Sequence, residues 1–234
     1  MSYSRHQLLA CEGAKIPDLI GENCKLLFVG INPGLQTAMT GIHFAHPSNR
    51  FWPALKKAGL IDWVPNVSPI APSVRVDMYD QSGTAATQTH FCHPSNRFYP
   101  ALRHAGLIDW SVDASTGMTP GQRDDLIAKG VGITNIVERA TARASELGRE
   151  ELRAGSVRLS RLVAGVAPKV VAVAGVTAFR TAFDVRNASL GRQAQDVSGC
   201  ELWVVPNPSG LNAHETIESL TDWYGQAADA AGVL

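Results

Sequence analysis

Residues 26–34 of the chain read Leu-Leu-Phe-Val-Gly-Ile-Asn-Pro-Gly, and the fold is inferred outward from this stretch. Its apolar run, Leu26 to Val29, is typical of a buried β-strand, and the Gly-x-Asn-Pro-Gly that follows predicts a tight turn. The turn presents one uncharged amide, Asn32, at the carboxyl end of the strand. Ligands of open α/β sheets bind at this edge, although the same residues also fit a turn in which Asn32 bonds only its own backbone.

Two later stretches repeat this pattern of an apolar run that ends in a polar loop. Residues 202–205 read Leu-Trp-Val-Val and lead into Pro-Asn-Pro-Ser-Gly-Leu-Asn at 206–212. Residues 132–137 read Gly-Ile-Thr-Asn-Ile-Val, a third strand with a polar end. Because helical patterns lie between these strands, we expect an α/β fold with a mostly parallel sheet covered on both faces.

The expected helices alternate with the strands and suggest one domain over residues 1–234. They cover residues 49–58, 121–129, 145–166, 176–183 and 213–228, and a further buried strand covers 170–174. Ser145 is the expected N-cap of the longest helix. Pro53 predicts a late start or a bend in the first.

The composition limits the partners and the compartment. The chain has 234 residues, 45% of them apolar, and equal numbers of basic and acidic residues, 21 each, so we expect only modest non-specific affinity for nucleic acid. Residues 139–161 are rich in arginine and also hold glutamates, which is typical of a solvated, salt-bridged helix face, with Arg139 and Arg143 as expected exceptions beside a strand end. No apolar run is long enough to span a membrane, and the N-terminus lacks a signal-peptide pattern, so we expect a cytoplasmic protein.

The four cysteines, Cys11, Cys24, Cys92 and Cys200, include no pair at C-x-x-C spacing. Structural zinc sites and iron–sulfur clusters normally need such closely spaced pairs. We therefore expect free thiols, no metal, no iron–sulfur cluster and no other cofactor.

Three motifs, in this order, resemble those of the mismatch-specific uracil-DNA glycosylases, the bacterial branch that also includes thymine-DNA glycosylase. They are Gly-Ile-Asn-Pro-Gly-Leu at 30–35, His-Phe-Ala-His-Pro-Ser-Asn-Arg-Phe-Trp at 43–52, and Asn-Pro-Ser-Gly-Leu at 207–211. The resemblance runs from about Pro17 to about Trp223 with one large interruption. It implies a three-layer α/β/α sandwich in the bacterial cytosol or nucleoid. It also implies a monofunctional DNA-repair hydrolase that flips uracil, with thymine and cytosine adducts as further candidates, out of a G mismatch in double-stranded DNA and leaves an abasic site.

The resemblance also implies roles for individual residues. Asn32 would position the attacking water through its amide oxygen, Phe44 would stack on the flipped base, and Asn135 would read the pyrimidine edge. The remaining implied pocket residues are Thr141, which helps hold the water, Ile31, Thr37 and His43 in the wall, and Asn207, which stands where faster relatives have a histidine for the leaving base. Phe44 is also compatible with an ordinary core position, and His43 with a structural histidine.

The loop after Asn207 would carry the contact with the DNA helix. The resemblance makes Leu211 a wedge for the hole left by the flipped nucleotide, with Gly210 and Asn212 beside the unpaired guanine. Many family members have serine where this chain has Asn212. Without the resemblance, Leu211 reads as an ordinary loop leucine.

A tandem repeat interrupts the resemblance. Residues 37–63 and 84–110 are two copies with a period of 47 that differ at only seven positions. Solenoids need at least three units, so we interpret the repeat as a duplicated segment within one domain. We expect the first copy to occupy the single docking groove and residues 64–110 to form an insertion. The protein would then be a monomer, and exchange of a repeat copy between two chains would be a route to a swapped dimer.

Two other classes of function remain. A non-catalytic protein that binds lesions or mismatches would keep the fold while the repeat disturbs the pocket. A nucleotide-binding α/β protein would use the glycine turn for phosphate. The chain has neither G-x-G-x-x-G nor G-K-[ST], and Pro33 removes an amide that such a loop would use, which disfavours the second class.

Overall fold

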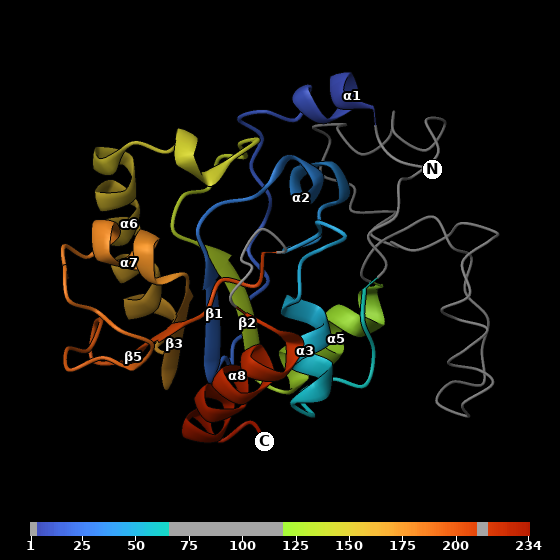
Figure 1. Cartoon of the computed structure of the whole chain (residues 1–234). Coiled ribbons are helices and arrows are strands. Elements are labelled where there is room, and N and C mark those ends of the chain that lie inside the picture. Colours follow the sequence, from blue (N-terminus) through green and yellow to red (C-terminus); the bar gives the residue numbers. More distant parts are fainter. Residues whose placement is uncertain (1–3, 66–118, 210–214) are drawn as a thin grey trace, which may run out of the picture.

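A central sheet of five strands organises the computed structural model, which describes residues 4–65, 119–209 and 215–234 (Figure 1). The spatial order is β2-β1-β3-β5-β4. The strands are β1 Leu26–Gly30, β2 Val131–Asn135, β3 Val170–Ala174, β4 Gly191–Arg192 and β5 Glu201–Val205. All pairings are parallel except that of the short edge strand β4, which runs antiparallel to β5.

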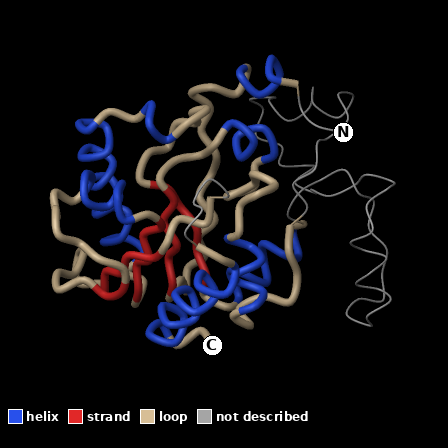
Figure 2. The backbone as a smooth tube through the Cα atoms, viewed as in Figure 1, coloured by secondary structure: helices blue, strands red, loops and turns tan. Residues whose placement is uncertain are grey.

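Helices cover both faces of this sheet, as Figure 2 shows. The core side chains of α3, α5 and α8 pack on one face, and those of α6 and α7 pack on the other. The helices are α1 Arg5–Leu9, α2 Leu35–Thr40, α3 Phe51–Lys57, α5 Pro120–Ala128, α6 Arg149–Val166, α7 Val176–Ala182 and α8 Ile217–Ala231, with a 3-10 turn at Ala144–Glu146.

The side chains of β1 show why the sheet needs two covering layers. Leu26 and Phe28 belong to the core shared with α3 and α8, whereas Leu27 and Val29 belong to the core shared with α6 and α7. Successive side chains of a strand point to opposite faces, so a continuous apolar strand is stable only when both faces are covered. The predicted α/β/α sandwich with a mostly parallel sheet is confirmed.

Some helix boundaries differ from the sequence prediction. Ser145 lies in the 3-10 turn, and α6 begins at Arg149 after Gly148 as its N-cap. Glu150 and Glu151 in the first turn favour this start, because negative charge stabilises a helix N-terminus. Pro53 lies in the first turn of α3, where its missing N–H is not needed as a donor.

The last helix is also shifted. It covers Ile217–Ala231 rather than residues 213–228, and the Thr216 hydroxyl caps it by accepting from the Ser219 N–H at 3.2 Å.

The first copy of the repeat is part of the core. It supplies residues 37–40 of α2, the loop after this helix and all of α3, and Phe51, Trp52 and Leu55 are at most 2% exposed. Figure 1 shows α3 lying beside α8. The second copy, residues 84–110, lies outside the described residues, so the proposed insertion stays a prediction.

Candidate active site

A cavity of about 810 Å³ opens at the carboxyl ends of the parallel strands. Its wall includes residues that follow β1, β3 and β5 directly, the last residue of β2, and the loop between α2 and α3. Seven of the residues predicted for the catalytic centre and base pocket line it: Ile31, Asn32, Thr37, Phe44, Asn135, Thr141 and Asn207. His43 does not line it.

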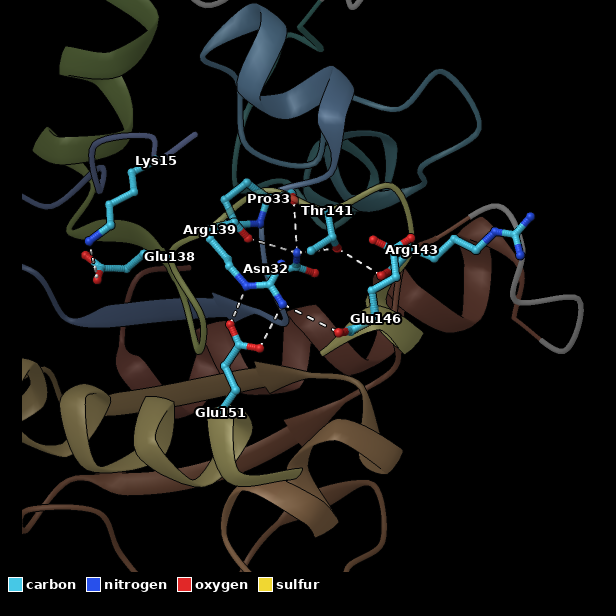
Figure 3. Close-up of polar contacts among 9 residues, drawn as sticks. All are labelled: Lys15, Asn32, Pro33, Glu138, Arg139, Thr141, Arg143, Glu146 and Glu151. Atoms are coloured by element: carbon cyan, nitrogen blue, oxygen red, sulfur yellow. Dashed lines mark hydrogen bonds and ion pairs between the residues drawn. The ribbon is translucent and has the colours of Figure 1, made fainter. Parts of the chain in front are cut away.

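The Asn32 amide nitrogen has three acceptors around it (Figure 3). Its Nδ2 donates to the Thr141 hydroxyl at 2.8 Å and lies 3.1 Å from both the Pro33 and the Arg139 carbonyl oxygens. The Thr141 hydroxyl donates in turn to the Arg143 carbonyl at 2.9 Å, which leaves its lone pairs for Asn32.

These contacts give the Asn32 amide one direction. An amide rotated by half a turn would place its oxygen against two carbonyl oxygens, so the nitrogen must occupy this corner. The Oδ1 atom accepts no hydrogen bond from the described residues, and Asn32 lines the cavity. The site therefore offers a fixed, uncharged acceptor that can orient a water molecule.

Helix α6 anchors the loop that supplies these acceptors. Arg139 donates from Nε and Nη2 to the Glu151 carboxylate at 2.5 and 2.9 Å, and these hydrogen bonds lower the pKa of Glu151 (Figure 3). The expected exception for Arg139 is therefore not supported, because its guanidinium binds α6. Arg143, by contrast, is exposed, lines the cavity and extends away from the Asn32 cluster in Figure 3.

Phe44 forms one wall of the cavity with an unusual backbone conformation. Its φ angle is 57°, in the left-handed region that costs a non-glycine residue roughly 1 kcal/mol or more. Its ring stacks on Phe51, with centroids 4.0 Å apart and an interplanar angle of 24°. The core thus supports the ring, which is in position for a further planar group on the cavity side.

Asn135 and Phe44 meet over Gly30. A Cβ built on Gly30 would lie 2.5 Å from Asn135 Oδ1 and 3.2 Å from the Phe44 ring. Only a glycine leaves space for both side chains here, which explains the residue at the end of β1.

His43 lies behind Asn135, so its predicted place in the pocket wall is corrected to a layer below. It is 3% exposed; its Nε2 lies 3.1 Å from the Pro17 carbonyl oxygen, and its Nδ1 lies 3.4 Å from Asn135 Nδ2. Burial is the main cause that lowers the pKa of the imidazole to about 4. The hydrogen bond to Pro17 raises this pKa, and the nearby Arg123 lowers it by a smaller amount. His43 is therefore neutral at physiological pH.

Asn207 is the second residue of the loop after β5, and its Oδ1 accepts from the Ser209 N–H at 3.0 Å. The Asn207 side chain lies beside Gly175, where a Cβ would be 3.8 Å from its Nδ2. The predicted wedge and its neighbours, Gly210, Leu211 and Asn212, lie outside the described residues. Ser209 and Glu215, the described residues on either side of them, both line the cavity.

The sequence prediction missed several parts of the wall, which include His46 and Asn49 before α3 and residues 142–145 after Thr141; two further parts differ in how they could have been found. One is Gly175 to Ala178 after β3, which the rule of strand carboxyl ends could have identified. The other is Glu215, the only carboxylate among the described residues that line the cavity. Its Oε2 accepts from the Ser219 hydroxyl at 2.6 Å, so it also belongs to the start of α8. No local pattern around Glu215 indicates a cavity.

Neither a metal-binding group nor a membrane-spanning helix is present among the described residues. No group of three or more His, Cys, Asp or Glu side chains there is arranged to hold a metal ion. Among those residues, no helix combines the length and apolar character needed to cross a membrane. Cys24 and Cys200 are buried free thiols, and burial raises the pKa of Cys24 to about 11.

Comparisons with known proteins agree with this arrangement. One similar solved structure is the NMR structure of a candidate uracil DNA glycosylase from Methanosarcina acetivorans. The match covers 94% of this chain and 96% of that protein, with a TM-score of 0.50 and 16% sequence identity, and it supports the fold alone. The sequence model of the Uracil DNA glycosylase superfamily matches residues 17–72 and 70–228, and each range contains one copy of the repeat. These matches together cover most of the chain, which therefore belongs to the Uracil DNA glycosylase superfamily of DNA-repair hydrolases.

Proposed function

We propose that this protein is a monofunctional DNA N-glycosylase of the mismatch-specific branch, which excises uracil from G mismatches in double-stranded DNA. The observation that carries the proposal is the fixed direction of the Asn32 amide. Its nitrogen is held by Thr141 and two carbonyl oxygens, so its oxygen is free to orient a water molecule in the cavity.

The chemistry of an amide sets the order of bond changes. Asn32 orients the water but cannot remove its proton at neutral pH. The C1′–N1 bond therefore breaks ahead of water attack, and its electron pair leaves with N1 of the base. The water oxygen then bonds to the electron-poor C1′, and its proton passes to solvent. The base anion takes up a proton from solvent at N1, so the products are the free base and an abasic site.

Other cavity residues hold the base and its developing charge. The Phe44 ring, supported by Phe51, stacks on the flipped base, which contributes roughly 1–3 kcal/mol in comparable aromatic contacts. Asn207 donates a hydrogen bond to the leaving base; a neutral amide stabilises the anion less than a charged donor does. This difference predicts slow base release compared with relatives that have a histidine at this position.

The loop beyond Ser209 completes the proposal. Leu211 fills the hole left by the flipped nucleotide, and Gly210 and Asn212 contact the unpaired guanine. Flipping costs a few kcal/mol and is least costly at a mismatch, which favours uracil or thymine opposite guanine over a paired base. No lysine lines the described part of the cavity, so an amine nucleophile for strand cleavage is not at hand there.

A non-catalytic protein that binds lesions is the second class of function. Its premise was that the repeat disturbs the pocket. Thr37 and Phe44 of the first copy line the cavity next to Asn32 and Asn135, which favours the enzyme.

The experiment compares Asn32→Ala with Glu215→Gln, which removes the only carboxylate of the described cavity wall. Single-turnover uracil release from a U·G duplex is measured, with T·G and single-stranded uracil as further substrates. Asn32→Ala should lower release by at least about 100-fold, the scale of losing one oriented catalytic group, while DNA affinity stays within a few-fold. Glu215→Gln should stay within about tenfold of the parent.

Three results would contradict the proposal. Release that survives in Asn32→Ala but disappears in Glu215→Gln would mean that a carboxylate activates the water. No release by the parent from any duplex, despite tight mismatch binding, would favour the non-catalytic protein. Strand cleavage without alkali would contradict monofunctional chemistry.

A further inference from the structure

The contact between His43 and Asn135 determines more than the packing of two buried side chains. His43 Nε2 faces the Pro17 carbonyl oxygen at 3.1 Å, and a carbonyl oxygen can only accept. The single proton of the neutral ring is therefore on Nε2. The other nitrogen, Nδ1, then has only a lone pair to offer to Asn135.

This lone pair selects one of the two directions of the Asn135 amide. With Nδ2 toward His43, the 3.4 Å contact is an N–H donor facing an acceptor. In the reversed amide, Oδ1 would face Nδ1 and two lone pairs would repel each other. The selected direction leaves Oδ1 over Gly30 beside the Phe44 ring, and both Asn135 and Phe44 line the cavity.

The direction of this amide distinguishes between pyrimidines. The pairing edge of uracil has an N3–H donor beside the O4 acceptor, and thymine has the same edge. Cytosine has the reverse pattern, an N3 acceptor beside the N4 amino donor. An amide with a fixed Oδ1 and a remaining Nδ2–H matches the uracil edge and mismatches the cytosine edge at both atoms.

We propose that His43 is a positioning residue that sets the base preference of the pocket: its Nε2–H tautomer holds the Asn135 amide in the direction that accepts uracil or thymine and rejects cytosine. The inference rests on the proposed glycosylase function. His43 touches no base in this arrangement and acts only through Asn135.

The test is His43→Leu, because leucine fills much of the volume of the imidazole but has no acceptor where Nδ1 stands. Uracil and cytosine are each placed opposite a tetrahydrofuran abasic analogue, so that neither has a pairing partner to lose. We expect the ratio of the uracil to the cytosine single-turnover rate to fall at least about tenfold relative to the parent, since a buried mismatched hydrogen bond discriminates by that much or more. Most of the fall should come from slower uracil release.

The matched control is Trp52→Phe. Trp52 Nε1 donates to the His43 carbonyl oxygen at 2.8 Å, so this variant disturbs the same loop but leaves the imidazole contacts in place. It should lower the melting temperature and leave the base ratio unchanged. Equal losses of both rates in His43→Leu, or a changed ratio in Trp52→Phe, would overturn the proposal, because His43 would then only support the fold.

Nitrogen NMR of the full-length parent separates this inference from the proposed function. The His43 ring nitrogens should report the Nε2–H tautomer, with Nδ1 unprotonated, whether or not the protein releases any base. An Nδ1–H tautomer would overturn the proposed positioning role of His43 even in an active glycosylase. A parent that releases neither base would contradict the proposed function. The tautomer alone would then support or overturn His43 as the residue that sets the direction of the Asn135 amide.

Discussion

Two neutral amides, Asn32 and Asn135, carry the chemistry proposed for this cavity, and each needs a defined direction. The oxygen and the nitrogen of an amide have nearly the same shape, so packing alone cannot distinguish them. Around Asn32 the direction comes from three acceptors, and around Asn135 it comes from the lone pair of His43. The precision of the site thus depends on partners that do not touch the substrate.

The buried His43 also predicts a pH dependence of stability. Its pKa in the folded protein is about 4, below the unfolded value of 6.5, so between these values the unfolded chain binds more protons. Its contribution is therefore present in full above pH 6.5 and is lost as the pH falls towards 4. The difference of about 2.5 pKa units corresponds to about 3 kcal/mol over the whole window.

Urea unfolding at pH 7 and pH 5 measures this effect. The parent should lose stability between these two values, and His43→Gln should show a flatter profile. His46→Gln, at an exposed position, is the control and should keep the parental slope. A parental slope in His43→Gln would show that other groups cause the pH dependence.

At the scale of elements, helix α6 approaches the loop after β2 so closely that one position must be glycine. A Cβ on Gly155 would lie 2.5 Å from the Ile136 carbonyl oxygen and 2.8 Å from Ile136 Cγ2. Because a backbone atom cannot move aside cheaply, either the helix or the loop between Asn135 and Thr141 must shift. This contact therefore links the helix packing to the geometry of both amides.

Gly155→Ala should lower the free energy of unfolding by roughly 1–3 kcal/mol, the usual cost of overpacking, and should slow uracil release as well. The matched control lies in the same helix: Gly165 is exposed, and a Cβ there meets no atom within 4 Å. Gly165→Ala should raise stability by up to about 1 kcal/mol through helix propensity. Equal effects of the two substitutions in denaturant unfolding would refute the close approach.

At the scale of the whole molecule, the fold has one docking groove, and either of the two nearly identical copies of the repeat could in principle pack into it. The first copy fits it at positions where the second differs. Gly41 has a φ of 69°, where the second copy has Gln88, and Ile42 is 1% exposed, where the second has Thr89. Trp52 donates its hydrogen bond to the His43 carbonyl, and the second copy has Tyr99 there.

Two deletions of equal length test this difference. Removing residues 64–110 joins Trp63 to Ser111, and removing residues 37–83 joins Gln36 to Thr84, so the two products differ only at the seven variable positions. The first variant should be a monomer that melts no lower than the parent and releases uracil at a comparable rate. The second should be less stable than the first by at least about 2 kcal/mol, from a strained glutamine and a buried threonine.

Melting temperatures, urea unfolding and size-exclusion chromatography of both variants decide the matter. A second variant as stable and active as the first would mean that either copy can fill the groove. An insoluble first variant beside an active second one would reverse the assignment of the copies.

Much of the architecture follows from the sequence because its causes are local or periodic. Continuous apolar runs such as Leu26 to Val29 require cover on both faces, and alternating helices supply it, so the three-layer sandwich could be predicted. Parallel strands place their carboxyl ends at one edge, which brings Asn32, Asn135 and Asn207 to one cavity. The start of α6 was predicted at Ser145 but lies at Arg149, because Ser145 is only one of several nearby residues that can precede a helix and Gly148 is the N-cap.

Only the tertiary structure decided which partner each polar side chain binds when the candidates are distant in the chain. Arg139 follows a strand end in the sequence, yet Glu151 on α6 binds it. His43 adjoins Phe44 in the motif, yet it lies below the cavity wall, against Pro17 and Asn135. The chain determined which polar groups reach the sheet edge, because strand direction and burial follow from local patterns. Only packing determined which of them face the cavity and which hold the others, since that depends on the nearest partner in space.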